Sequence, residues 1–208
     1  MKRAFHDITN ITRKNIKLTI HKSSHRKKLV RWLYEVVEDF EYSQVTFAMA
    51  VYILDRYTVN KGFNLSEYQL IGITVLFIAA KFEEPKNKGV ADYVEVTDSS
   101  VNRKEILEME REILSSFGFN LDLQTPHRYL RIWYLEKMDC KFSLEERQEI
   151  LFCSFAYILE KHTCRHNMYW MYLEGIREAE KVLSGHCLSD ELRFYIEHNR
   201  TTKNLVFM

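Results

Sequence analysis

Glycine and proline are scarce in this chain, with six glycines and two prolines among 208 residues. Folds made of many short strands need these residues at their frequent turns, so the scarcity favours long helices over an all-β fold. The four cysteines follow no disulfide spacing, which indicates a reduced, intracellular protein. They are Cys140, Cys153, Cys164 and Cys187.

Long apolar runs are also lacking. The longest, residues 70–80, is shorter than the roughly 20 residues that a helix needs to cross a bilayer, so we expect no membrane contact. Residues 1–7 contain no apolar segment, and we therefore expect no export signal.

The net charge of +1 hides a strong asymmetry. Residues 1–31 hold ten of the 30 basic residues and one of the 29 acidic residues, so the remainder carries 20 basic and 28 acidic residues. Such a basic arm is typical of an import signal, a contact with an anionic partner, or a solvated tail.

Apolar residues recur at steps of three and four after residue 22. Residues 29–40 and 45–57 each show this spacing, which predicts two amphipathic helices. Residues 70–80 are apolar on every side and predict a helix enclosed by others, with Gly72 allowing a neighbour to approach closely.

Further signals complete a first bundle of about five helices. Ser66 and Gln69 have the spacing of a capping box, which predicts the start of the enclosed helix. A short helix is expected around residues 91–94, and a longer one from Ser99 or Ser100.

Thr125 followed by Pro126 predicts the start of a second helical unit. Residues 168–183 keep a single apolar stripe, and the chain ends at Met208, so we expect this bundle to be shortened and open on one side. The expected fold is all-α. Its parts are a basic arm over residues 1–22, a bundle over residues 23–124 and a shortened bundle over residues 125–208.

Five stretches of the first unit resemble the cyclin box. They are RKKLVRWLYEV at 26–36, AVYILDRY at 50–57, YQLIGI at 68–73, AAKFEE at 79–84 and ILEMEREIL at 106–114. The similarity runs over about residues 25–130 almost without gaps and continues more weakly to about residue 198. It implies two tandem cyclin-like bundles and a non-enzymatic subunit that binds and allosterically activates a cyclin-dependent protein kinase in cell-cycle control.

The resemblance assigns a kinase-binding role to Lys81 and Glu110. In cyclins, a lysine ending the third helix and a glutamate on the fifth hydrogen-bond to backbone groups of the kinase. Charged groups form stronger hydrogen bonds than neutral ones and can bind a partner's backbone whatever its side chains. Phe82, Leu114 and Leu121 correspond to apolar residues around that pair, and ordinary core packing is the equally open alternative for each.

The resemblance also implies a substrate-docking groove that captures Arg-x-Leu motifs in several cyclins. The matching residues are Leu29, Trp32, Glu35 and Gln69. His25 and Lys28 stand where docking cyclins carry apolar residues, so docking here is expected to be weakened or retuned. A half-buried core role for Trp32 is the alternative. Arg26 and Asp55 align with a structural ion pair that joins the first two helices.

Residues 2–10 are similar to the destruction box of mitotic cyclins. They keep its Asp-Ile-Thr-Asn end, but Lys2 and Phe5 replace the usual arginine and leucine. This implies recognition by the ubiquitin-ligase degradation machinery and a mitotic type of cyclin, acting in the nucleus and cytoplasm.

The sequence shows no glycine-rich phosphate loop, nucleophile elbow or paired-acid site. We therefore predict no catalytic residues and no cofactor, which disfavours an enzyme on a helical scaffold. His162, Cys164 and His166 are of metal-binding type, but their spacing fits no common zinc site, so no metal is predicted. A transcription-type cyclin fold that binds nucleic acid or the transcription machinery is the alternative, disfavoured because residues 32–208 are net acidic.

Overall fold

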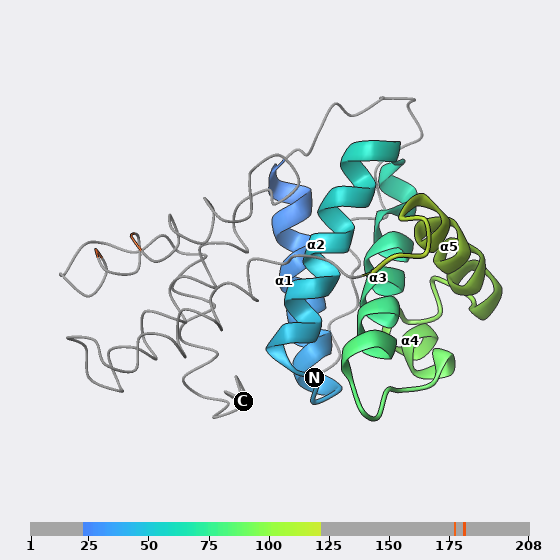
Figure 1. Cartoon of the computed structure of the whole chain (residues 1–208). Coiled ribbons are helices and arrows are strands. Elements are labelled where there is room, and N and C mark those ends of the chain that lie inside the picture. The colour runs from blue at the N-terminus through green and yellow to red at the C-terminus, as the bar shows by residue number, and fades with distance from the viewer. Residues whose placement is uncertain (1–22, 122–176, 178–180, 182–208) are drawn as a thin grey trace. The chain divides into compact units, whose positions relative to one another are not determined.

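The computed structural model describes residues 23–121 together with Arg177 and Lys181. Between residues 23 and 121 the regular structure is entirely helical, which confirms the all-α prediction for this part (Figure 1). The helices are α1 (Ser23–Asp39), α2 (Gln44–Lys61), the short 3₁₀ helix η1 (Leu65–Glu67), α3 (Tyr68–Glu83), α4 (Val90–Val96) and α5 (Arg103–Ser116).

The chain divides into two compact units, Met1–Leu123 and Gln124–Met208. The predicted arm over residues 1–22 lies outside the described residues. So does the predicted shortened bundle over residues 125–208, apart from Arg177 and Lys181.

Helix α3 lies at the centre of the first unit and contacts α1, α2, α4 and α5. Residues 71–80 are all buried, as expected for a stretch that is apolar on every side. Each large aliphatic side chain removed from water there contributes roughly 1.5–3 kcal/mol to folding. The segment Leu65–Glu83 is long and apolar enough, by length and composition alone, to cross a membrane. However, 67% of its apolar window is buried inside the protein, as expected of a core helix.

Gly72 allows α1 to approach α3 closely. A Cβ atom at this position would lie 2.7 Å from Cδ1 of Leu29, closer than real side chains come. The close approach predicted for Gly72 is therefore confirmed, and Leu29 of α1 is the neighbour.

The start of α3 differs from the prediction. The capping box was expected at Ser66 and Gln69, but Ser66 lies inside η1 and Gln69 is buried in the first turn of α3. The same spacing occurs two residues earlier, where the backbone N–H of Asn64 donates to Glu67 at 3.5 Å. The capping pair at this helix start is therefore Asn64 with Glu67, not Ser66 with Gln69.

Helix α5 starts at Arg103, later than predicted from Ser99 or Ser100. Asp98 and Ser99 have φ values of 55° and 56°, which place them in the left-handed region and exclude them from a right-handed helix. Asn102 caps α5 instead. Its side chain accepts from the backbone N–H of Glu105 at 3.0 Å, and its own N–H donates to that glutamate's carboxylate at 2.7 Å.

Candidate functional site

Lys81 and Glu110, the two residues that the sequence singled out, lie together in the structure. Lys81 is in the last turn of α3, and Glu110 is in the middle of α5, a helix that packs against α3. The Lys81 ammonium forms an ion pair with the Glu110 carboxylate. The side chain of Lys81 is 40% exposed, whereas that of Glu110 is 10% exposed. In the free chain these two charged groups therefore satisfy each other at the protein surface.

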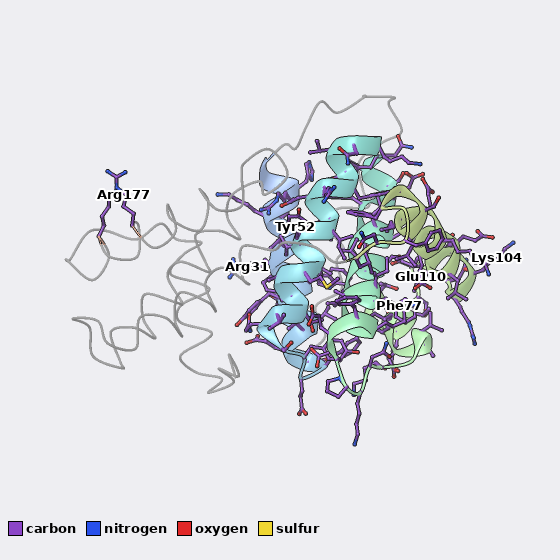
Figure 2. The ribbon with its side chains drawn as sticks, viewed as in Figure 1. Arg31, Tyr52, Phe77, Lys104, Glu110 and Arg177 are labelled. Atoms are coloured by element: carbon purple, nitrogen blue, oxygen red, sulfur yellow. The ribbon has the colours of Figure 1, made fainter. Side chains whose placement is uncertain are left out.

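The ring of Phe77 lies beneath the same ammonium. Phe77 precedes Lys81 by one helical turn, and the ammonium nitrogen is 4.3 Å from the ring centroid. Figure 2 labels Phe77 on α3 and Glu110 on α5. Partial burial lowers the pKa of Lys81 from its ordinary value of 10.5. The position at the C-terminal end of α3 favours a cation, since the helix dipole is negative there.

Phe82 follows directly and is 51% exposed, so the core-packing alternative is wrong for this residue. Leu114 and Leu121 are half-buried. Phe119 is 70% exposed, with a φ of 56°, and the sequence reasoning missed it. The available signal was its place directly after Gly118, beyond the end of the amphipathic α5, where no helical face buries it. Among the described residues, Phe82 and Phe119 are the large apolar side chains that are exposed.

Glu84 ties the end of α3 to the start of α2. Its carboxylate accepts the backbone N–H of Ser43 at 2.7 Å and the hydroxyl of Thr46. Its own backbone N–H donates to the carbonyl of Ala80 at 2.9 Å. Phe82 is thus held between two anchored residues, Lys81 and Glu84.

Two buried tyrosines hold the loop that follows. The backbone N–H of Lys88 donates to the Tyr42 hydroxyl at 2.7 Å, and the hydroxyls of Tyr42 and Tyr93 lie 2.9 Å apart. Burial raises the pKa of both phenols above the usual 10, so both stay neutral at physiological pH. This network joins the loop between α3 and α4 to the segment between α1 and α2, through Tyr42, and to α4, through Tyr93.

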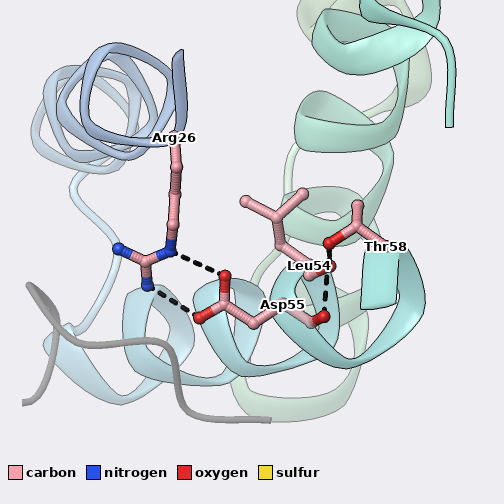
Figure 3. Close-up of polar contacts among 4 residues, drawn as sticks. All are labelled: Arg26, Leu54, Asp55 and Thr58. Carbon is pink, nitrogen blue, oxygen red and sulfur yellow. Dashed lines mark hydrogen bonds and ion pairs between the residues drawn. The ribbon is translucent and has the colours of Figure 1, made fainter. Parts of the chain in front are cut away.

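A second ion pair lies inside the bundle. Arg26 of α1 donates to both carboxylate oxygens of Asp55 on α2, each at 2.7 Å (Figure 3). Their side chains are 2% and 0% exposed. The hydroxyl of Thr58 donates to the carbonyl of Leu54 at 2.8 Å in the same region. The pair joins α1 to α2, the structural role that the resemblance assigned to it.

The predicted docking-groove residues offer little surface. Leu29 is 0%, Trp32 7% and Gln69 6% exposed, so of the four only Glu35 is exposed. Leu29 is occupied by its contact with Gly72 and does not line a surface groove in this structure. Of the two positions that depart from the family pattern, His25 is half-buried and Lys28 exposed.

The described residues hold no cluster of three or more His, Cys, Asp or Glu side chains able to bind a metal ion. The histidines and cysteines weighed as metal ligands, at positions 162, 164 and 166, lie outside these residues.

Residues 5–122, more than half of the chain, match the family described as "Cyclin, N-terminal domain". Cyclin-A1-2 of Arabidopsis thaliana is 38% identical over 109 residues, which are 52% of this chain and 25% of that protein. G2/mitotic-specific cyclin-B3 of Gallus gallus is 38% identical over 106 residues, 51% of this chain and 26% of that protein. The matched region thus spans about a quarter of the length of these relatives.

Two solved structures share the fold. A viral cyclin from herpesvirus saimiri superposes with a TM-score of 0.64 at 20% identity, covering 89% of this chain and 85% of that one. A chain of the CAK complex from Chaetomium thermophilum bound to ATP-gamma-S superposes with a TM-score of 0.53 at 16% identity, covering 86% of this chain and 60% of that one. At these identities the likeness concerns the fold alone.

Proposed function

Because the chain belongs to the cyclin family, we propose that it binds a cyclin-dependent protein kinase and switches it on. The observation that carries the proposal is the surface pair of Lys81 and Glu110 with the exposed Phe82 beside it. A cation, an anion and an apolar side chain at one site suit a partner that offers backbone carbonyl and N–H groups next to an apolar contact.

The proposed mechanism is allosteric. The face formed by the end of α3 and by α5 presses on the mobile helix of the kinase. This brings that helix's glutamate to the ATP-orienting lysine and orders the activation loop. The chain itself supplies no catalytic group in this scheme and acts as a regulatory subunit rather than an enzyme.

The test is reconstitution. The full chain is purified and mixed with each cyclin-dependent kinase of its own cell, and phosphorylation of a generic protein substrate is measured. We expect one kinase or a small subset to be activated, and the double variant Lys81→Ala with Glu110→Ala to activate it much less. Failure of the wild-type chain to bind or stimulate any of these kinases would refute the proposal.

Four finer roles rest on the sequence resemblance. They are docking of Arg-x-Leu substrates, recognition of residues 2–10 by the degradation machinery, a mitotic role, and a location in nucleus and cytoplasm. The burial of Leu29, Trp32 and Gln69 weighs against an open docking groove in the free chain. A fluorescently tagged chain followed through the cell cycle would test location, timing and destruction together.

A further inference from the structure

The ammonium of Lys81 has two described neighbours, one charged and one aromatic. One is the carboxylate of Glu110, and the other is the face of the Phe77 ring, 4.3 Å from the nitrogen to the centroid. The negative face of an aromatic ring attracts a cation at this distance, and the attraction grows as water is excluded. The site therefore contains a third member, which neither the sequence resemblance nor the comparisons assign.

The geometry of the helix brings Phe77 and Lys81 together. They are four residues apart on α3, and side chains at i and i+4 of an α-helix share a face. Phe77 is 7% exposed, so its ring is largely embedded in the core while the lysine above it remains 40% exposed. A rigid buried ring thus lies directly under a long, partly exposed side chain.

The Phe77 ring is held in its orientation by other aromatic residues. Tyr93 of α4 meets it edge to face, with centroids 5.0 Å apart and an interplanar angle of 68°. Phe40 meets Tyr93 in the same way at 5.2 Å and 81°. The Tyr93 hydroxyl is 2.9 Å from that of Tyr42. Since edge-to-face packing is a favourable geometry of aromatic pairs, this row of rings fixes the plane of the ring that Lys81 covers.

We infer that Phe77 is a positioning residue for partner binding, because its ring holds the Lys81 ammonium against Glu110 in one orientation. This inference rests on the proposed function, in which Lys81 meets the kinase. A free lysine side chain samples many rotamers, and ordering it on binding reduces affinity. The ring removes part of that loss by ordering the lysine before the partner arrives.

Ordinary core packing is the competing explanation for Phe77. Phe47 offers a matched control, because it is another buried phenylalanine, 0% exposed, with an edge-to-face aromatic neighbour in Tyr34 at 5.2 Å. The ring that lies beneath the Lys81 ammonium is that of Phe77, not that of Phe47. Both Phe77→Leu and Phe47→Leu reduce core packing, but Phe77→Leu alone removes the ring beneath Lys81.

The first readout needs no partner. In the full chain labelled with ¹³C-lysine, the Lys81 signals are identified by their loss in Lys81→Arg. The ring current of Phe77 should shift the Hε protons of Lys81 upfield. We expect Phe77→Leu to move these signals to the position of exposed lysines and Phe47→Leu to leave them unchanged. Signals of Lys81 that do not move in Phe77→Leu would overturn the inference.

The second readout is affinity for the kinase that the wild-type chain activates. We expect Phe77→Leu to weaken binding about two- to fivefold, the range for a partly exposed cation–ring contact, and Phe47→Leu to leave it near wild type. Equal weakening by both variants would show a purely structural role. If Phe77→Leu does not fold, Phe77→Met offers a side chain of similar volume that is longer and more adaptable and also has no ring. If the wild-type chain binds no kinase, the proposed function fails, while the spectrum still shows whether the ring holds Lys81.

Discussion

Two ion pairs in the first unit have the same sequence separation of 29 residues but opposite surroundings. Arg26 and Asp55 are 2% and 0% exposed and joined by two hydrogen bonds of 2.7 Å. Lys81 is 40% exposed and Glu110 is 10% exposed. A buried guanidinium and carboxylate are shielded from solvent and from an incoming protein, whereas a half-exposed ammonium can exchange its contact for one from outside. The comparison separates a pair committed to the fold from a pair available for binding.

The largest effect is expected where the buried pair is broken. Asp55→Ala removes the carboxylate that pairs with the buried Arg26 guanidinium, which costs about 3–5 kcal/mol of the free energy of unfolding. Chemical denaturation followed by circular dichroism measures the loss. Lys61→Ala is the control, because Lys61 and Glu112 are about half exposed at 3.4 Å, and such pairs contribute about 0–1 kcal/mol. A loss as small as that of the control would contradict the assignment of Arg26 and Asp55 to the fold.

Breaking the surface pair should instead affect binding. Under the proposed function, Lys81→Ala or Glu110→Ala would remove charge-assisted hydrogen bonds to the kinase of roughly 1.5–3 kcal/mol, a loss of about tenfold or more in affinity. Stability should fall by less than about 1 kcal/mol in Glu110→Ala, because the remaining Lys81 side chain is 40% exposed to water. The fall should be larger in Lys81→Ala, because the Glu110 carboxylate is only 10% exposed and loses its ion-pair partner.

Titration calorimetry with the activated kinase measures that loss. Lys104→Ala is its control, because Lys104 forms an exposed pair with Glu108 on α5 at 3.7 Å. Wild-type affinity in both Lys81→Ala and Glu110→Ala would show that the pair does not contribute to kinase binding.

A third change probes the surroundings of the buried pair. The Tyr68 hydroxyl is buried without a hydrogen-bond partner among the described residues, and its ring stacks on Phe63 at 4.4 Å. Burial and the charge of Asp55 raise its pKa, so the phenol is neutral. Because an unpaired buried hydroxyl is unfavourable, Tyr68→Phe should stabilise the chain by up to about 1 kcal/mol. A clear destabilisation in urea unfolding would mean that this hydroxyl has an acceptor.

The smallest effect concerns salt. Raising ionic strength from about 0.05 M to about 1 M shortens the screening length from more than 10 Å to about 3 Å. A double-mutant cycle on Lys81 and Glu110 should lose most of its coupling energy over this range, whereas the cycle on Arg26 and Asp55 should change little. Equal salt dependence of the two cycles would erase the distinction between them.

The periodic parts of the fold could be predicted from the sequence. Residues 70–80 are apolar on every side and form the enclosed helix, and the missing side chain of Gly72 correctly predicted a close neighbour. The helix starts were harder. The capping-box spacing of Ser66 with Gln69 is also present in Asn64 with Glu67. Spacing alone does not decide which of two overlapping capping boxes starts the helix. The left-handed backbone at Asp98 and Ser99 could not be predicted, because neither residue is a glycine, the usual sequence signal for this conformation.

The sequence predicted Lys81 and Glu110 as members of the candidate site, but not how they are arranged. Both Lys81 and Glu110 were assigned to a partner's backbone, and their pairing with each other depends on how α3 and α5 pack. Phe77 was indistinguishable from the other apolar residues of its helix, because periodicity carries no information on which ring faces a cation. Phe119 escaped notice because it follows α5 rather than lying on its apolar face.

The anchoring of the segment that carries Phe82 has a consequence for the speed of association. Lys81 is held on one side by Glu110 and Phe77, and Glu84 on the other by Ser43 and Thr46. A partner meeting this surface does not have to wait for a loop to fold or rearrange. We therefore expect an association rate constant set by diffusion and orientation, on the order of 10⁵–10⁷ M⁻¹s⁻¹, with substitutions at the site acting mainly on the lifetime of the complex.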